Sequence, residues 1–228
     1  MIIGSGLIAT AMRSVFAKQD LCIFAAGVSN SGCRDDAEFA RERARLVKAM
    51  DEHSQAGRFV YFGTCSVGDP DAVQSQYVQH KFAMEKLVAE HPRHVIFRLP
   101  QVVGHTPNPH TLLNYLYARI SRSESFAVWT NLTRNVLCAE DIARLVRWLV
   151  LHEDSVNETI SIAHPQSVRI LEIVSAFEKI TRKRAIFSEL PLGSAYTIDC
   201  ARIAGAISGC EIDFNNDYLG RVLTKYYA

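Results

Sequence analysis

The 228-residue sequence lacks long apolar runs and has no excess of charge of one sign. A membrane-spanning helix needs about 18 consecutive apolar residues, and no stretch approaches that length. Twenty-five basic and 24 acidic residues leave a formal net charge of +1. This balance gives no reason to expect nucleic acid or an anionic membrane surface as a partner. With 48% hydrophobic and 21% charged residues, the composition is that of an ordinary globular protein.

Cysteine pairs and targeting signals are also missing. The six cysteines show no Cys-x-x-Cys spacing, and most lie in apolar runs, which is typical of reduced, buried thiols in a cytoplasmic protein. No zinc site is expected. Met1 leads straight into an apolar strand without the basic segment or cleavage site of a signal peptide, so we expect a cytoplasmic location. The absence of repeats and linkers favours one α/β domain, alone or with a small lobe.

The stretch from Phe59 to Lys81 carries the chemistry. It begins with a short apolar run that predicts a buried strand ending at Gly63. A helical pattern follows, with Tyr77 and Lys81 at i and i+4 on one face. A phenol has a pKa near ~10, and a cation held beside it lowers that value. Thr64 at the strand end can hydrogen-bond the same oxygen, so the set predicts proton transfer to or from a carbonyl or alcohol.

A glycine turn opens the chain. Gly4-x-Gly6-x-x-Ala9 stands between a strand stub and a helix expected to run to about Lys18. Glycine permits a tight turn and a close backbone approach to a pyrophosphate. The amides of the helix N-terminus can then donate hydrogen bonds to the phosphate oxygens. The turn therefore predicts dinucleotide binding.

Together these motifs resemble those of the extended short-chain dehydrogenase/reductases that act on nucleotide sugars, the NAD-dependent epimerase/dehydratase branch. Thr64 and Tyr77-x-x-x-Lys81 resemble the catalytic set of the family. The other similar stretches, in the family's order, are Gly4-Ser-Gly6-Leu-Ile-Ala9, Phe24-Ala-Ala-Gly27, Phe97-Arg-Leu-Pro-Gln-Val-Val-Gly104 and Arg134-Asn-Val-Leu-Cys-Ala-Glu-Asp141. The resemblance runs to about Asp141 and continues more loosely to the end.

The resemblance implies a nicotinamide cofactor, NAD or NADP, and hydride transfer at a sugar carbon, commonly C4. Enzymes of this kind serve polysaccharide biosynthesis. Tyr77 would exchange the proton, Lys81 would hold the nicotinamide ribose, and Thr64, or as second candidate Ser66, would orient the substrate oxygen. The remaining residues implied to bind the cofactor are Gly4, Gly6, Leu7, Ile8, Ala9, Ala25, Ala26 and Gly27.

A nucleotide sugar is the expected substrate. Arg134 resembles the arginine that holds its diphosphate, for which a planar guanidinium is well shaped, although a surface salt bridge is the alternative. Asn108, Thr111 and Asn114 are candidates to face the sugar and equally suit helix caps. His105 and His110 lie in a proline-containing loop, which we interpret as a rigid polar loop and not a metal site, because no acid or cysteine completes a ligand set.

One part of the family pattern is missing. A dinucleotide fold carries an acid about 20 positions after the glycines, at the end of its second strand, to bind the adenosine ribose. Here Asp20 precedes the next expected strand, Leu21 to Ala26, and no acid follows it. That strand resembles a later one of the family. We therefore expect two missing strands and weak cofactor binding, with Arg13 and Arg34 the nearest basic groups for a 2′-phosphate.

The alternation of strands and helices predicts an α/β fold: a doubly wound, mostly parallel Rossmann-type sheet lacking two early strands, with a small interleaved substrate lobe. Residues 1–104 and 127–164 are expected to form the cofactor-binding domain, and 105–126 and 165–228 the lobe. In the helix expected from about residue 35 to 53, we interpret the charged residues as a solvated face; they are Arg41, Glu42, Arg43 and Arg45.

Three reactions share the expected catalytic set. The family's 4,6-dehydratases place an acid pair directly after the threonine, and Cys65-Ser66 stands there instead, which disfavours dehydration. A 4-epimerase must keep its cofactor, and the missing strands argue mildly against it. A 4-ketoreductase exchanges its cofactor and is favoured. A catalytically silent binding relative stays open, as does a homodimer.

Overall fold

The computed structural model describes residues 1–16, 20–153 and 155–228. Its centre is a five-stranded sheet with the order β1-β2-β3-β4-β9, in which every pair of neighbours is parallel. The strands are β1 (Ile2–Ile3), β2 (Cys22–Phe24), β3 (Phe59–Thr64), β4 (His94–Leu99) and β9 (Glu158–Ser161). The connections from strand to strand run through helices, as a parallel sheet requires.

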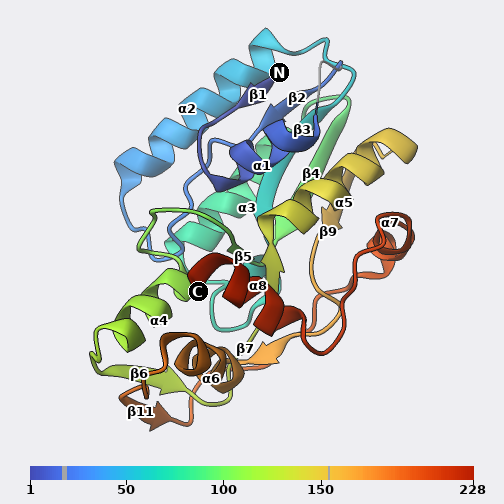
Figure 1. Ribbon diagram of the computed structural model, residues 1–228. Helices are drawn as coiled ribbons and strands as arrows, with labels where there is room; N and C mark the ends of the chain where they lie inside the picture. Colours follow the sequence, from blue (N-terminus) through green and yellow to red (C-terminus); the bar gives the residue numbers. More distant parts are fainter. Residues whose placement is uncertain (17–19, 154) are drawn as a thin grey trace.

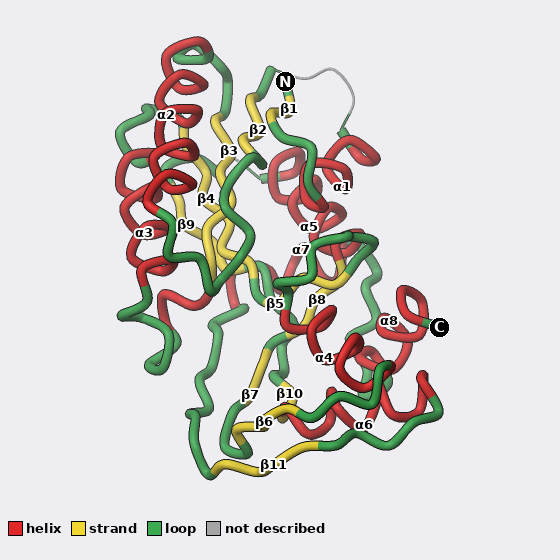
Figure 2. The backbone as a smooth tube through the Cα atoms, turned by 90° about the vertical axis from the view of Figure 1, so that its left-hand side faces the viewer, coloured by secondary structure: helices red, strands yellow, loops and turns green. Residues whose placement is uncertain are grey.

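Helices cover both faces of this sheet (Figure 1). On one face lie α2 (Asp36–Glu52) and α3 (Gln76–Val88), and on the other α1 (Leu7–Val15) and α5 (Ala139–His152), as Figure 2 shows in edge view. Successive residues of β3 point to opposite faces: Phe59 and Tyr61 pack with α2 and α3, and Val60 and Phe62 with the other layer. The predicted doubly wound parallel α/β sheet is thereby confirmed.

The edge of the sheet is shortened as expected. β1 pairs directly with β2, with Ile2 opposite Ile23 and Ile3 opposite Phe24, and only α1 is described between them. The expected end of that helix at Lys18 lies outside the described residues. Among the residues that the structure describes, no helix is long and apolar enough to cross a membrane.

The second half of the chain adds a lobe below the sheet (Figure 2). Its long helices are α4 (Leu112–Ser121), α6 (Ile170–Thr181) and α8 (Tyr218–Tyr227). Shorter helices are η1 (Cys65–Gly68), directly after β3, and η2 (Ala201–Ile203) and α7 (Ala204–Gly209) ahead of α8. Three further strand pairs are β5 (Gln101–Val103) with β8 (Val136–Cys138), β6 (Phe126–Trp129) with β11 (Phe187–Leu190), and β7 (Thr133–Arg134) antiparallel to β10 (Val168–Arg169).

These pairs change the expected division of the chain. The strands β6 and β7 fall within or next to 127–164, the stretch expected to join the sheet domain, yet their partners β11 and β10 belong to 165–228. We therefore propose that the lobe includes 126–134, and that the sheet domain resumes with β8 and α5.

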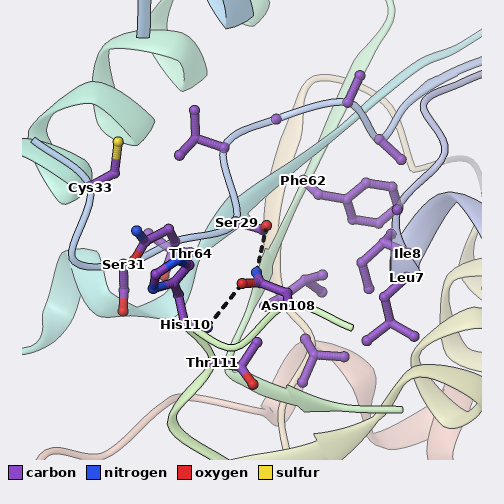
Figure 3. A pocket seen from close by; sticks show the side chains of 18 of the residues that line it. Leu7, Ile8, Ser29, Ser31, Cys33, Phe62, Thr64, Asn108, His110 and Thr111 are labelled. Atoms are coloured by element: carbon purple, nitrogen blue, oxygen red, sulfur yellow. Dashed lines mark hydrogen bonds between the residues drawn. The ribbon is translucent and has the colours of Figure 1, made fainter. Parts of the chain in front are cut away.

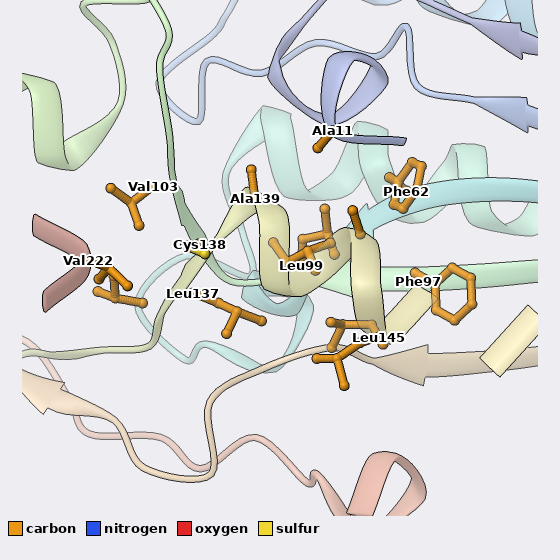
Figure 4. Close-up of a cluster of buried hydrophobic side chains, with 14 of the residues drawn as sticks. Ala11, Phe62, Phe97, Leu99, Val103, Leu137, Cys138, Ala139, Leu145 and Val222 are labelled. Carbon is orange, nitrogen blue, oxygen red and sulfur yellow. The ribbon is translucent and has the colours of Figure 1, made fainter. Parts of the chain in front are cut away.

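Sheet and lobe share one apolar core. The larger cluster of buried side chains runs from Phe62 and Phe97 of the sheet through Leu145 of α5 to Leu137 of β8 and Val222 of α8 (Figure 4). All five are at most 7% exposed. Because side chains of both parts fill this core, the lobe is fixed against the carboxyl ends of the sheet strands, where the cleft described next opens.

Candidate active site

A cleft of about 1020 Å³ lies at the carboxyl ends of the parallel strands. The segments that follow β1, β2 and β4 line it, together with the end of β3, the first turns of α3 and the 105–111 loop. Figure 3 shows side chains from these segments around one space, with Leu7 and Ile8 on one side and Thr64, Asn108 and Thr111 across from them. In open α/β sheets, ligands bind at this edge.

The glycine turn has the geometry that a diphosphate needs. Gly4 has φ +127°, and a Cβ built on it would lie 2.2 Å from the Ala25 carbonyl oxygen, so only glycine fits there. Gly6 is the N-cap of α1 and provides no side-chain cap, and a Cβ on it would meet nothing within 4 Å. The first amides of α1 have no intrahelical acceptors, and Gly6 at their head lines the cleft. Leu7 and Ile8 line the cleft, whereas Ala9 is fully buried and packs inside.

The loop after β2 forms the floor of the cleft. Ala25, Ala26 and Gly27 line it, as expected. A Cβ on Gly27 would lie 2.7 Å from a carboxylate oxygen of Glu42 and 2.8 Å from the ammonium of Lys81. A side chain at this position would therefore displace the buried ion pair that lies directly beneath the loop.

The three expected catalytic side chains line the same cleft. Thr64 ends β3 and its hydroxyl accepts from the Ser66 amide at 3.2 Å, while Tyr77 in the first turn of α3 is hydrogen-bonded to Thr64. The expectation that Lys81 lowers the pKa of Tyr77 is wrong for this structure. Burial raises that pKa, the negative charge of Glu42 raises it further, and the bond with Thr64 opposes them.

Lys81 does not stand alone because Glu42 of α2 holds it. The Lys81 ammonium donates to Glu42 Oε1 at 3.0 Å, and the two residues are 3% and 2% exposed. The interpretation of Glu42 as part of a solvated face is therefore wrong. The sequence contained a signal: Glu42 lies three residues after Phe39 and four before Leu46, two apolar positions of the helix, and so on their face.

Two of the five residues expected to contact the substrate, Thr111 and Asn114, stabilise the chain near the cleft. Thr111 lines the cleft and caps α4 by accepting from the Asn114 amide. Asn114 is absent from the lining, because its side-chain amide donates to the carbonyl oxygens of Thr106 and Asn108 and its oxygen accepts from the Tyr227 hydroxyl at 2.6 Å. Asn114 therefore braces the loop that carries Asn108.

Asn108 and Ser66 lie in the cleft lining. The Asn108 side chain connects two sides of the cleft, since its amide donates to Ser29 Oγ at 3.1 Å and its oxygen accepts from the His110 amide (Figure 3). Of the two basic groups expected for a 2′-phosphate, Arg34 lines the cleft, while the guanidinium of Arg13 donates to the Gly4 carbonyl oxygen.

Arg134 is not part of the cleft lining. Its Nη1 lies 3.2 Å from Oδ2 of Asp69, whose side chain is 2% exposed, and the other oxygen of Asp69 accepts from the Asp71 amide. The geometry thus matches the salt-bridge alternative, although the pair is buried and not at the surface. In the part of the chain that the structure describes, no group of three or more metal-ligating side chains occurs.

Solved structures with this fold share little sequence with the chain. Epimerase Mth375 from Methanothermobacter thermautotrophicus has a TM-score of 0.72 at 14% identity, covering 98% of this chain and 78% of that one. UDP-glucose 4-epimerase from Thermus thermophilus, solved with NAD, has 0.71 at 12%, covering 98% and 83%. RMD from Pseudomonas aeruginosa, solved with NADPH, has 0.70 at 16%, covering 90% and 81%.

These likenesses establish the fold, and none of the curated proteins matches the sequence. The family is shown by the sequence itself. A model described as the NAD dependent epimerase/dehydratase family matches residues 7–163, which is well over half of the chain and includes Thr64, Tyr77 and Lys81, so the chain belongs to this family.

Proposed function

We propose that the protein reduces a keto group of a nucleotide sugar, at C4, with NADH or NADPH. The observation that carries the proposal is that a single cleft gathers the glycine turn, the loop after β2, Thr64, Tyr77 and Lys81. A dinucleotide needs the first two and a carbonyl substrate the last three. Enzymes solved with UDP-sugars and NAD share the fold, MoeE5 with UDP-glucose among them.

The residues of the cleft fit the nicotinamide cofactor. Gly6 and the free amides of α1 would hold the diphosphate, the loop from Ala25 to Gly27 would lie along the dinucleotide, and Lys81 would hold the nicotinamide ribose. When bound, the reduced cofactor supplies the hydride that the carbonyl carbon accepts. At the adenosine end of the cofactor, the acidic residue that binds the ribose in the family has no counterpart. The strand that would carry it is missing, and β1 forms the edge of the sheet.

Tyr77 is the proton donor of the proposed reaction. Its hydroxyl would transfer a proton to the carbonyl oxygen as that oxygen becomes an alkoxide, and Thr64 would orient the same oxygen by hydrogen bonding. Burial and the charge of Glu42 raise the pKa of Tyr77, so the phenol is fully protonated at neutral pH. A proton donor requires that protonated state.

The two positions after Thr64, where the family's dehydratases carry an acid pair, hold Cys65 and Ser66. Cys65 occupies the position after Thr64, is 5% exposed, and donates through its thiol to the Arg98 carbonyl oxygen at 3.3 Å. Burial raises the pKa of this thiol to about 12. Cys65 therefore stays a neutral, structural thiol, which leaves the reductase and the 4-epimerase as the candidate activities.

The test is an assay of the purified protein with a panel of nucleotide sugars and nucleotide 4-keto sugars and both reduced cofactors. The proposal expects stoichiometric cofactor oxidation with a 4-keto sugar. Interconversion of two nucleotide sugars without net cofactor oxidation would move the assignment to the epimerase. Calorimetric binding of a nucleotide sugar without turnover under any condition would make the chain a silent relative.

A further inference from the structure

A buried charged cluster lies behind the catalytic side chains. The Glu42 carboxylate receives four groups: the Val28 amide at 2.7 Å, the Tyr61 hydroxyl at 2.8 Å, and the His80 ring and Lys81 ammonium at 3.0 Å. They come from the loop after β2, from β3 and from α3. Glu42 itself belongs to α2, so one carboxylate joins four segments around Tyr77.

The cluster is built to keep Glu42 ionised. Burial by itself would raise the pKa of the Glu42 carboxyl, but the hydrogen bond from His80, the charge of Lys81 and the bonds from Val28 and Tyr61 together hold it well below its usual range. The Lys81 ammonium also lies 4.6 Å from the centre of the Tyr61 ring. A buried pair with so many partners has little freedom to rearrange.

We propose that Glu42 is a positioning residue for the proton transfer: it fixes the Lys81 ammonium beneath the Ala25–Gly27 loop and offsets the charge of that ammonium at Tyr77. The proposal rests on the proposed function. Lys81 lines the cleft and Glu42 does not, so Glu42 acts through the lysine and not on the substrate.

The consequence concerns the charge that Tyr77 experiences. The groups that act on Tyr77 from neighbouring elements are Thr64 and Tyr61 of β3 and Glu42 of α2, and Lys81 lies one turn further along its own helix. With Glu42 ionised, the cationic effect of Lys81 is neutralised. A Glu42→Gln substitution keeps the shape but removes the negative charge, which leaves the lysine as an uncompensated cation that favours the phenolate.

The experiment measures tyrosinate formation by ultraviolet difference titration, without cofactor or substrate. The Tyr77 signal is obtained by subtracting the same protein carrying Tyr77→Phe. Glu42→Gln is expected to lower the pH at which Tyr77 ionises by at least about one unit, the size of a single nearby charge effect. Glu42→Asp, which keeps the charge, is expected to ionise close to wild type.

Glu85→Gln is the matched control, because Glu85 is also buried, at 4% exposed, and lies on α3, but pairs with Arg98. It is expected to leave the Tyr77 titration unchanged. Thermal melts confirm that each variant is folded. If Glu42→Gln does not fold, the Tyr77 titration of Glu42→Asp is compared with that of wild type, and a clear difference between the two would overturn the inference.

The outcomes separate this inference from the proposed function. A Tyr77 titration unaltered by Glu42→Gln would overturn the inference even if the wild type reduces a keto sugar. A clear shift in a protein that turns over no sugar would uphold the role of Glu42 and refute the reductase. In an active enzyme, the pH profile of kcat is expected to move to lower pH in Glu42→Gln, with KM for the sugar changed less than kcat.

Discussion

Removing the Arg134 guanidinium should destabilise the protein more than it weakens ligand binding. Arg134→Ala leaves Asp69, which is 2% exposed, as a buried carboxylate whose remaining hydrogen-bond partner, among the described residues, is the Asp71 amide. Removing one partner of a buried pair costs roughly 3–5 kcal/mol. We expect the lower end, about 3 kcal/mol, because the Arg134 side chain is 17% exposed and water can reach part of the gap.

The assays are urea denaturation and thermal unfolding of wild type, Arg134→Ala, Asp69→Asn and the double variant. For a chain of this size, about 3 kcal/mol corresponds to a fall in Tm of roughly 6–12 °C. The double variant should recover at least about 1 kcal/mol relative to the sum of the single losses, as interacting pairs do. Equal stability of wild type and Arg134→Ala, together with a loss of nucleotide-sugar affinity of about 1.5–3 kcal/mol, would refute this reasoning. It would instead support Arg134 as a ligand of the substrate's diphosphate.

Three further predictions follow from the site and the core. Gly4→Ala should abolish dinucleotide binding in a calorimetric titration, because its Cβ would lie 2.2 Å from a backbone oxygen and φ is +127°; unchanged binding would exclude the turn as the diphosphate site. The dissociation constants of NAD and NADP should agree within about tenfold, ~1.4 kcal/mol, in protein that purifies largely without cofactor; tightly bound NAD would contradict this and favour the epimerase. The free energy of unfolding should fall with rising pH from about 9, because burial raises the pKa of Cys22 and Cys65 from 9.0 to about 11 and about 12. These thiols hold protons more tightly when folded, so their contribution is full below 9 and is lost through that window; Tm values that do not fall between about pH 9 and 11 would contradict it.

Periodicity predicted the long elements accurately. The strand expected from Phe59 to Gly63 spans Phe59–Thr64 in the structure, and the helix expected from about residue 35 to 53 spans Asp36–Glu52, because an apolar run and a regular helical pattern are local properties. The short strands β5 to β8 and β10 were not predicted. Each has two to four residues, and so brief a segment is a strand only through a partner distant in the sequence.

The cleft was predicted by motif, and its electrostatics were not. The spacing of Tyr77 and Lys81 indicated that they share a face of one helix, and both line the same cleft in the structure. The sequence could not indicate that Glu42 reaches Lys81 from another helix, since that contact joins residues 39 positions apart. A charged residue at an apolar helix position is the sign to look for in such a case.

The most direct test of the central claim, that Tyr77 is the acid of a nicotinamide-dependent keto reduction, is the steady-state rate of cofactor oxidation with a nucleotide 4-keto sugar in wild type and Tyr77→Phe. The substitution removes the hydroxyl and preserves the ring, and general acid catalysis contributes roughly 10²–10⁴-fold. We expect kcat to fall at least about a hundredfold, with calorimetric sugar-nucleotide affinity almost unchanged. A Tyr77→Phe variant that retains near-normal kcat would contradict the account.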